Sequence, residues 1–355
     1  MKKIVLTGGG TAGHVTPNIA LIPSLKKLGY EITYIGSYEG IEKKLIEQEG
    51  IPYFGISTGK LRRYFAKENF TDPFRVLKGY DEARKLLKKI APDVVFSKGG
   101  FVAVPVVSAA GLQKIPTIIH ESDMTPGLAN RLCVRYARKV CCNFPETVSS
   151  LPKGKAVLTG TPIREALYHG DPEKGMALCG FTEKKPVLMI MGGSLGAAPV
   201  NDWMRRVLPE LLQDFQVVHL CGKGKLDESL SSVRGYVQFE YIQEELPDLF
   251  ALSDIIVSRA GANAICEIAA LAKPNLLIPL SARASRGDQI LNARSFERQG
   301  YSKVLEEEEI TAEKLVQTIH DLYREKDTFI SNMKNSPGLD SIGKIIQLIE
   351  EAARR

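Results

Sequence analysis

Residues 3–14 read KIVLTGGGTAGH, and residues 187–197 read VLMIMGGSLGA. Each stretch joins a short apolar run to a glycine-rich turn, the pattern of a buried strand that ends where a helix begins. Apolar runs without polar alternation are typical of parallel strands covered on both faces. A glycine-rich turn also brings backbone N–H groups and a helix N-terminus close to an anion. The two stretches therefore predict two phosphate-binding turns, one in each half of the chain.

Strand and helix patterns alternate outward from both turns. Strands are predicted over residues 3–7, 31–35, 51–56, 93–97 and 117–120, and again over 187–191, 216–220, 237–240, 255–258 and 275–278. Helices are predicted up to Leu28 and over residues 41–48, 81–90 and 341–353. This alternation predicts an α/β fold with a parallel, doubly wound sheet in each half. Two such Rossmann-like domains would face each other across an interdomain cleft.

The length of 355 residues, about twice that of a single domain, agrees with two cores. Turn-forming residues near Gly160 to Pro162 predict domains over 1–162 and 163–340, with a final helix over 341–355 that can return to the N-terminal domain. No apolar run is long enough to span a membrane, and the first apolar run is too short for a secretory signal. We therefore expect a cytoplasmic protein, whose six cysteines are buried, reduced thiols.

The net charge of +6 comes from one segment, because residues 60–89 hold ten Lys or Arg and four Asp or Glu. Within residues 60–78 these cations alternate with aromatic side chains, namely Tyr64, Phe65, Phe70 and Phe74. Such a mixture suits an anionic membrane surface. A solvated helix face with its aromatics in the core is the alternative. No nucleic-acid-binding module accompanies the charge.

A second group of candidates follows the strand at 255–258. A helix predicted to start near Ala262 offers its N-terminus to a diphosphate, and Glu267 could accept hydrogen bonds from a ribose diol. A carboxylate that only complements the helix dipole is the alternative. Further along, Asp288 and Gln289 could bond sugar hydroxyls, or they could simply belong to a polar loop and helix cap.

Two histidines are candidates for a general base. His14 follows the first glycine turn, where a helix N-terminus favours the neutral imidazole. The pair His120 and Glu121 is the second candidate, and the sequence does not choose between them. No Asp-x-Asp occurs in the chain. We therefore expect no metal, with Arg164 and helix dipoles neutralising a leaving diphosphate.

Several weak motifs occur together and in one order, and with them the chain resembles the MurG family of UDP-N-acetylglucosamine-dependent transferases. They are residues 9–14, 98–100, 120–121, 160–164, 192–197, 259–267 and 289–293. The resemblance implies the GT-B fold and an inverting transfer that needs no metal or other cofactor. It implies transfer of N-acetylglucosamine to lipid I, forming lipid II for bacterial peptidoglycan synthesis. The protein would act peripherally on the inner face of the cell membrane.

The resemblance also implies roles for single residues. Arg164 and Ser194 would contact the nucleotide, Ile242 the uracil, Glu267 the ribose and Gln289 the sugar hydroxyls. His14 would be the base on the acceptor side. The sugar and diphosphate would lie against Thr11, Ala12, Gly13, Ala262, Asn263 and Ala264.

Some positions depart from the family pattern and bear on which sugar and acceptor are used. Ser122 and Asp123 stand where Gln and Asn are usual, Phe101 replaces a tyrosine, and Leu195 replaces a polar residue. A related transferase with another lipid or small acceptor therefore stays an alternative, as does a catalytically weak paralogue that binds a UDP-sugar. An oxidoreductase is disfavoured, because the glycine spacing differs from the dinucleotide fingerprint.

Overall fold

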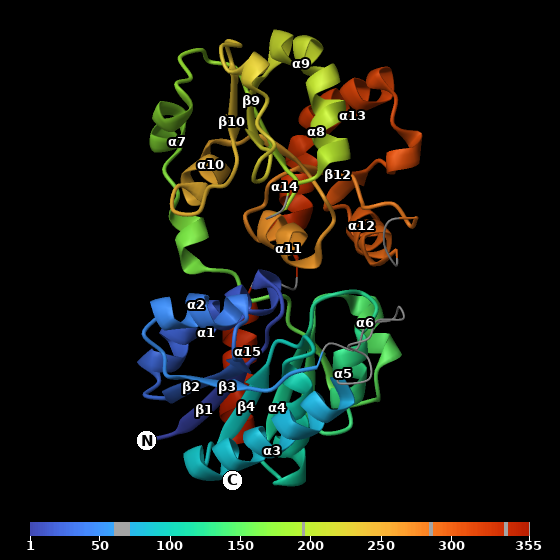
Figure 1. Ribbon diagram of the computed structural model, residues 1–355. Helices are drawn as coiled ribbons and strands as arrows, with labels where there is room; N and C mark the ends of the chain where they lie inside the picture. The colour runs from blue at the N-terminus through green and yellow to red at the C-terminus, as the bar shows by residue number, and fades with distance from the viewer. Residues whose placement is uncertain (60–71, 194–195, 284–286, 337–339, 355) are drawn as a thin grey trace. The chain divides into compact units, whose positions relative to one another are not determined.

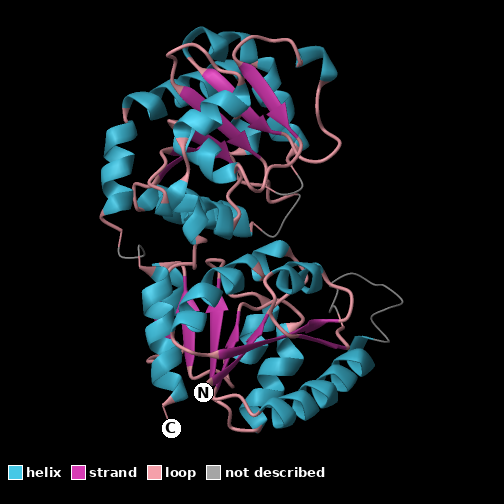
Figure 2. Cartoon of the chain, turned by 90° about the vertical axis from the view of Figure 1, so that its left-hand side faces the viewer, coloured by secondary structure: helices cyan, strands magenta, loops and turns pink. Residues whose placement is uncertain are grey.

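The computed structural model describes residues 1–59, 72–193, 196–283, 287–336 and 340–354. The chain forms two compact units (Figure 1). The N-terminal unit comprises Met1–Arg164 together with Asp340–Arg355, and the C-terminal unit comprises Glu165–Leu339. Each unit has its own parallel sheet, with helices on both faces (Figure 2).

Seven parallel strands form the sheet of the N-terminal unit, in the order β3-β2-β1-β4-β5-β6-β7. The strands are β1 Lys3–Thr7, β2 Glu31–Ser37, β3 Tyr53–Ile56, β4 Val94–Ser97, β5 Thr117–Glu121, β6 Lys139–Cys142 and β7 Ala156–Leu158. The helices are η1 Ala12–His14, α1 Thr16–Lys27, α2 Ile41–Gln48, α3 Asp72–Ile90, α4 Ala103–Leu112, α5 Leu128–Cys133, α6 Pro145–Ser150 and α15 Ser341–Ala353.

Strand β1 is apolar over its three central residues because both of its faces are covered. Ile4 and Leu6 pack in a cluster with side chains of α1 and α15. Val5, whose side chain points to the other face of the sheet, packs with side chains of α3 and α4. A parallel sheet enclosed in this way requires a continuous apolar run, which is the signal that the sequence carries.

The last helix, α15, belongs to the core of the N-terminal unit. Ile345 and Ile349 are fully buried in the cluster around β1 and α1. At the start of α15 the Ser341 hydroxyl donates to the Thr161 carbonyl at 2.7 Å. Near its end Glu350 accepts from Lys2 at 2.7 Å. The segments most distant in sequence are therefore packed together.

The C-terminal unit has a six-stranded parallel sheet in the order β10-β9-β8-β11-β12-β13. Its strands are β8 Val187–Met191, β9 Gln216–Leu220, β10 Tyr236–Phe239, β11 Ile255–Ser258, β12 Asn275–Leu277 and β13 Ser302–Val304. Its helices are η3 Glu165–His169, α7 Pro172–Cys179, α8 Ala198–Arg206, α9 Leu208–Asp214, η4 Glu228–Leu230, α10 Leu246–Leu252, α11 Ala262–Ala270, α12 Asp288–Arg298, η5 Glu307–Glu309, α13 Ala312–Arg324 and α14 Lys326–Lys334.

The prediction of two parallel, doubly wound sheets is confirmed. The predicted bounds of β1, α2 and α15 agree with the structure. Helix α3 begins at Asp72 rather than Asp81 and so takes in part of the basic segment. Strands β6, β7 and β13 were not predicted. Of the helices among the described residues, none has the length and apolar character needed to cross a membrane.

Candidate active site

Each sheet reverses its strand order at one point, and most predicted site residues lie there. In the N-terminal unit β1 pairs with both β2 and β4, and the helices that follow β1 and β4 pack on opposite faces of the sheet. In the C-terminal unit β8 pairs with both β9 and β11. In open α/β sheets, ligands bind outside the carboxyl ends of the strands at such points. Four of the sequence motifs directly follow strands β1, β4, β8 and β11. They are residues 8–14, 98–100, 192–197 and 259–267.

The first glycine turn, residues 8–10, donates a backbone hydrogen bond to the carboxylate of Glu42. Glu42, a fully buried residue in the first turn of α2, accepts the Gly10 N–H at 3.2 Å and the Ser37 N–H at 3.1 Å. A Cβ on Gly9 would lie only 2.6 Å from the Glu42 carboxyl group. The turn is therefore folded around the Glu42 carboxylate, and the Gly10 N–H is not available to a phosphate.

The two glycine turns of the N-terminal unit interlock. Gly10 has φ +88°, and a Cβ there would lie 2.5 Å from the ring of Phe101. Gly100 has φ +81°, and a Cβ there would lie 2.3 Å from the Gly9 carbonyl oxygen. Larger residues would force the turns apart, so the contact explains both glycines. It also gives Phe101, a departure from the family pattern, a packing role.

His14 ends the short helix η1, which carries Ala12 and Gly13 and directly follows Thr11. The Thr11 hydroxyl and His14 Nδ1 lie 3.0 Å apart. Burial and the nearby charge of Lys98 lower the pKa of His14 to about 4, although Glu42 acts in the opposite direction. The imidazole is therefore neutral at physiological pH, as a base on the acceptor side requires.

Glu121, the last residue of β5, is 4% exposed and is enclosed by donors from its own loop. Its carboxylate accepts from the Asp123 N–H at 3.1 Å, the Gly127 N–H at 3.0 Å and the Asn130 side chain at 2.9 Å. Burial raises the pKa of Glu121, which these hydrogen bonds partly offset. The arrangement shapes the loop at residues 122–127.

Arg164 is the last residue of the N-terminal unit before the chain enters the C-terminal unit. Its side chain is half-buried. The Nε atom is buried and has no hydrogen-bond partner within the described part of the chain. A buried guanidinium N–H in this state is ready to donate to an anion.

In the C-terminal unit, three residues separate β11 from helix α11, which carries Ala262, Asn263, Ala264 and Glu267. Gly261 occupies the N-cap position and no side chain of the described residues caps the helix. The first-turn N–H groups and the helix dipole are thus directed at the carboxyl edge of the sheet, where an anion would be stabilised.

The remaining predicted residues lie on loops or helix starts of the same unit. Gln289 is the second residue of α12, and its amide oxygen accepts the Leu280 N–H at 3.0 Å. The NH₂ group of that amide is therefore the part that can donate to a ligand. Ile242 is half-buried on the loop after β10. Ser194 and Leu195 lie outside the described residues.

Sequence reasoning missed an ion pair that holds the loop after β12. Arg259 donates to the carbonyl oxygens of Ile278 and Pro279, both at 3.1 Å, and to Glu307 at 2.5 Å. Glu307 in turn accepts the Ser281 N–H at 3.1 Å. Glu307 lies in an acidic run at residues 306–309, far from Arg259 in the sequence, and only the fold brings the two side chains together.

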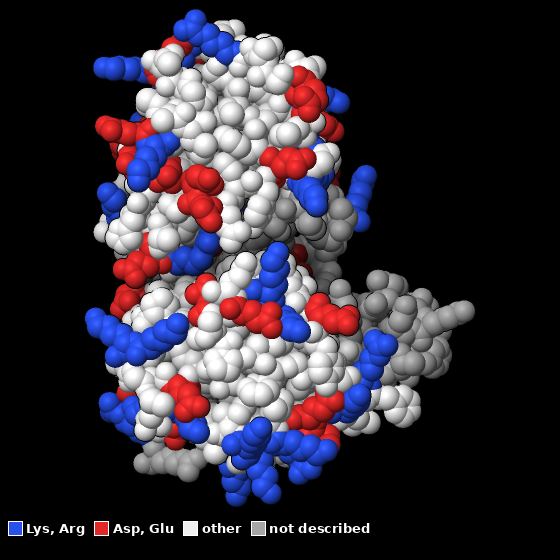
Figure 3. Space-filling model, turned by 60° about the vertical axis from the view of Figure 1, so that its left-hand side comes forward, with Lys and Arg blue, Asp and Glu red and all other residues white. Residues whose placement is uncertain are grey.

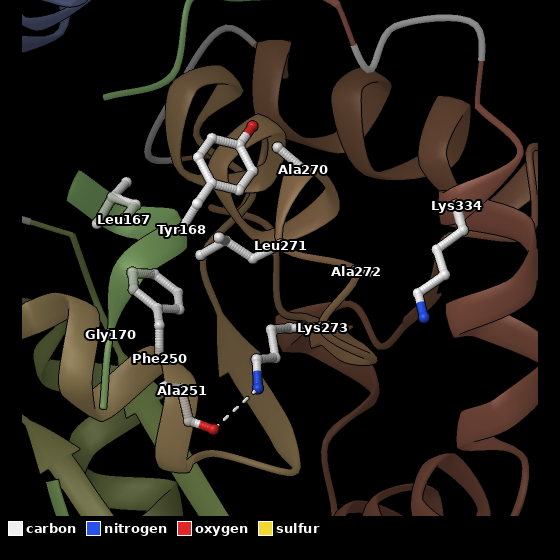
Figure 4. Close-up of a pocket in the computed structure, with 10 residues that line it drawn as sticks. All are labelled: Leu167, Tyr168, Gly170, Phe250, Ala251, Ala270, Leu271, Ala272, Lys273 and Lys334. Carbon is white, nitrogen blue, oxygen red and sulfur yellow. Dashed lines mark hydrogen bonds between the residues drawn. The ribbon is translucent and has the colours of Figure 1, made fainter. Parts of the chain in front are cut away.

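A separate pocket of about 300 Å³ opens in the C-terminal unit (Figure 4). Leu167, Phe250 and Leu271 line it, with the ammonium group of Lys273 bonded to the Ala251 carbonyl. Ala270, the last residue of α11, and Leu271, which follows it, lie at the end of that helix opposite to Ala262. This pocket therefore contains none of the predicted site residues. Among the described residues, no group of three or more His, Cys, Asp and Glu side chains could hold a metal ion.

Comparison with known proteins gives full-length matches. Residues 4–142 match the model of the glycosyltransferase family 28 N-terminal domain, and residues 187–349 that of the family 28 C-terminal domain. A protein of Lachnospira eligens named UDP-N-acetylglucosamine--N-acetylmuramyl-(pentapeptide) pyrophosphoryl-undecaprenol N-acetylglucosamine transferase is 64% identical over 354 residues, which is 100% of both chains. A protein of Lachnoclostridium phytofermentans with the same name is 66% identical over 99% of both chains.

Among solved structures, the crystal structure of Acinetobacter baumannii MurG resembles this chain with a TM-score of 0.78 and 25% identity. The alignment covers 99% of this chain and 100% of that one. The likeness therefore extends through both units.

Proposed function

Because this chain belongs to glycosyltransferase family 28, we propose that it transfers N-acetylglucosamine from UDP-N-acetylglucosamine to the muramyl-pentapeptide of undecaprenyl-linked lipid I. The product would be lipid II, used in peptidoglycan synthesis. What supports the proposal most directly is the identity of 64% and 66%, over essentially the whole chain, to relatives named for this transfer. The two Rossmann-like units are those of a GT-B glycosyltransferase.

We assign the acceptor to the N-terminal unit, with His14 as base. Neutral His14 takes the proton of the attacking hydroxyl as that oxygen bonds to the anomeric carbon, and the bond from this carbon to UDP breaks. A pKa of about 4 makes the free imidazole a weak base. The negative charge of a bound diphosphate would raise this pKa, because an adjacent anion favours imidazolium. Glu121 is assigned a positioning role, since its carboxylate already accepts three hydrogen bonds from its loop.

We assign the nucleotide to the C-terminal unit and to Arg164. Leaving UDP would place its diphosphate at the N-terminus of α11, near Ala262 to Ala264, where the helix dipole stabilises negative charge. The Nε of Arg164, which has no hydrogen-bond partner among the described residues, would donate to the nucleotide. Glu267 would hold the ribose, Ile242 the uracil and Gln289 the sugar hydroxyls, while Ser194 would also contact the nucleotide.

We further propose that the N-terminal unit binds an anionic membrane surface from the cytoplasmic side. Of the basic and aromatic segment at residues 60–78, residues 60–71 lie outside the described residues. On the part of α3 that follows, Phe74 is 74% and Leu77 65% exposed. Arg75 and Lys78, on the same turns of α3, are exposed as well. A further cluster of Lys and Arg side chains lies at the lower end of this unit (Figure 3). Exposed apolar side chains among cations suit a bilayer that carries the lipid-linked acceptor.

The test is transfer of labelled N-acetylglucosamine from the UDP-sugar to a lipid I analogue. Donor binding without transfer to any acceptor would contradict the enzyme and favour a UDP-sugar-binding paralogue. Transfer to other lipids or small acceptors, but not to the lipid I analogue, would contradict the assigned acceptor.

Two variants separate the assigned roles. His14→Ala should lower kcat by about 10²- to 10⁴-fold and leave the Kd for UDP unchanged, because only the proton transfer is lost. Glu267→Ala should raise the Kd for UDP, measured by calorimetry. The exposed residues His169 and Glu313 supply matched controls as His169→Ala and Glu313→Ala. Unchanged turnover in His14→Ala would eliminate His14 as the base, and unchanged UDP affinity in Glu267→Ala would eliminate the ribose contact.

A further inference from the structure

Lys98 is a buried lysine at the switch point of the N-terminal sheet. It follows β4 directly, and only 1% of its surface is exposed. Its Cβ would lie 3.2 Å from a Cβ on Gly8, so its side chain starts against the first glycine turn. Its ammonium nitrogen lies 3.0 Å from His120 Nδ1 and also bonds the Ser122 hydroxyl. Lys98 thus links the turn after β1 to the turn after β5.

These contacts determine which ring nitrogen of His120 carries the proton. His120 Nε2 lies 2.9 Å from the Gly160 carbonyl oxygen, which can only accept, so Nε2 donates. Nδ1 must then accept from the Lys98 ammonium group. Only a neutral His120 with its proton on Nε2 satisfies both partners. Burial, followed by the charge of Lys98, lowers the pKa of His120 well below its ordinary value.

The same lysine acts on His14. Two charged groups face that ring from neighbouring elements, Lys98 after β4 and Glu42 in α2. Lys98 lowers the pKa of His14 and Glu42 raises it, while burial is the largest cause of the decrease. Gly8 lies between the two residues, because a Cβ on it would be 2.5 Å from the His14 carbonyl oxygen and 3.2 Å from the Lys98 Cβ. Lys98 is therefore close to both histidines that the sequence offered as bases.

We infer that Lys98 is a positioning residue for the transfer: its charge, set against the first glycine turn, favours the neutral form of His14, and its hydrogen bond fixes the tautomer of His120. Ser122, another departure from the family pattern, completes this arrangement by accepting from the same ammonium group. The inference rests on the proposed role of His14 as base. Its effect on the imidazole rings can nevertheless be measured without turnover.

The test is Lys98→Met, which removes the charge and keeps the length of the side chain. The chain has five histidines, so their titrations can be followed separately by NMR of a histidine-labelled protein. The titration midpoint of His14 should move to higher pH. The acidic limb of kcat/KM should move with it, so that kcat/KM falls further between pH 8 and pH 5 in the variant than in the wild type. UDP affinity should not change, and Lys98→Arg, which retains the charge, should keep the wild-type profile.

Lys155→Met is the matched control. Lys155 lies in the same unit and donates to the carbonyl oxygens of Val134 and Arg135, at 2.9 and 3.4 Å, and its charge is not among those that act on His14. Lys98→Gln, also neutral, replaces Lys98→Met if that variant loses its UDP affinity or its cooperative unfolding. A wild-type His14 midpoint in the neutral variant overturns the inference. A shifted His14 midpoint together with an unchanged pH profile of kcat/KM contradicts the proposed role of His14 as base. It would also contradict any role of Lys98 in catalysis.

Discussion

At the scale of single residues, His219 is a fully buried imidazole in β9 of the C-terminal unit. Its Nδ1 lies 2.8 Å from the Tyr236 hydroxyl, and its Nε2 lies 3.0 Å from the side-chain oxygen of Asn201. Burial, followed by the charge of Arg205, lowers the pKa of His219 to about 3. The folded protein therefore keeps this ring neutral where an unfolded chain would protonate it.

The consequence is a loss of stability in acid. Between the ordinary pKa of 6.5 and the folded value of about 3, the unfolded state binds the extra proton, so stability falls as pH falls. His219→Gln, which cannot be protonated, should reduce the loss of unfolding free energy between pH 7.5 and pH 5 by about 2 kcal/mol. Urea titration of the full chain at both pH values measures this. The exposed residue His169 supplies the control as His169→Gln, and an unchanged loss in His219→Gln would refute the prediction.

At the scale of elements, the first turns of α3 bring exposed apolar side chains to the candidate acceptor site. A helix that connects parallel strands runs back along the sheet, so its N-terminus lies at the carboxyl edge of the strands. A Cβ on Gly79 would lie 1.9 Å from the carbonyl oxygen of Ser57, so α3 packs closely on the loop after β3. Phe74 and Leu77 are therefore at the edge of the sheet that carries the glycine turns.

Membrane association should depend on that end of α3. Replacing both Phe74 and Leu77 by serine should weaken binding to phosphatidylglycerol vesicles by about tenfold or more, because each apolar side chain contributes about 1.5–3 kcal/mol when buried. Leu112→Ser is the control, since Leu112 is 62% exposed but ends α4, near the opposite edge of the sheet. Co-sedimentation measures the binding. Equal binding of the double variant and wild type would exclude α3 as the membrane contact.

At the scale of the whole molecule, the chain leaves the N-terminal unit at Arg164 and returns at Asp340. Helix α15 then fills the core around β1, with Ile345 and Ile349 fully buried. The Tyr30 hydroxyl and Lys2 both donate to Glu350, which ties the helix to the opposite end of the sequence. The stability of the N-terminal unit thus depends on residues that follow the entire C-terminal unit.

Removal of residues 340–355 should therefore destabilise one unit selectively. Each buried isoleucine contributes about 1.5–3 kcal/mol, which is a large fraction of a domain's stability. Calorimetry should show a lowered or missing transition for the N-terminal unit, while UDP still binds. Removal of residues 354–355 alone is the control, because α15 ends at Ala353. Two transitions at their wild-type temperatures in the longer truncation would contradict this view of α15.

The sequence by itself determined the layers of the fold and where most site residues lie along it. The apolar runs at 3–7 and 187–191, the turns that follow them and the periodicity of α2 and α15 are local signals. They predict strand, turn and helix correctly because backbone conformation responds to neighbouring residues. The strands β6, β7 and β13 were missed because each short run has a lysine in it or next to it, whereas the equally short β11 begins with three apolar residues.

Only the tertiary structure decided which side chains meet. That β1 lies beside β4 is fixed by hydrogen bonds between residues about ninety positions apart, and sequence patterns do not encode them. This pairing brings Lys98 under Gly8 and within reach of His120, and α2 brings Glu42 against Gly9. The glycine-rich turn was read from the sequence as a phosphate site. In the folded protein its Gly10 N–H bonds a carboxylate, because long-range packing determines which partner a backbone donor finds.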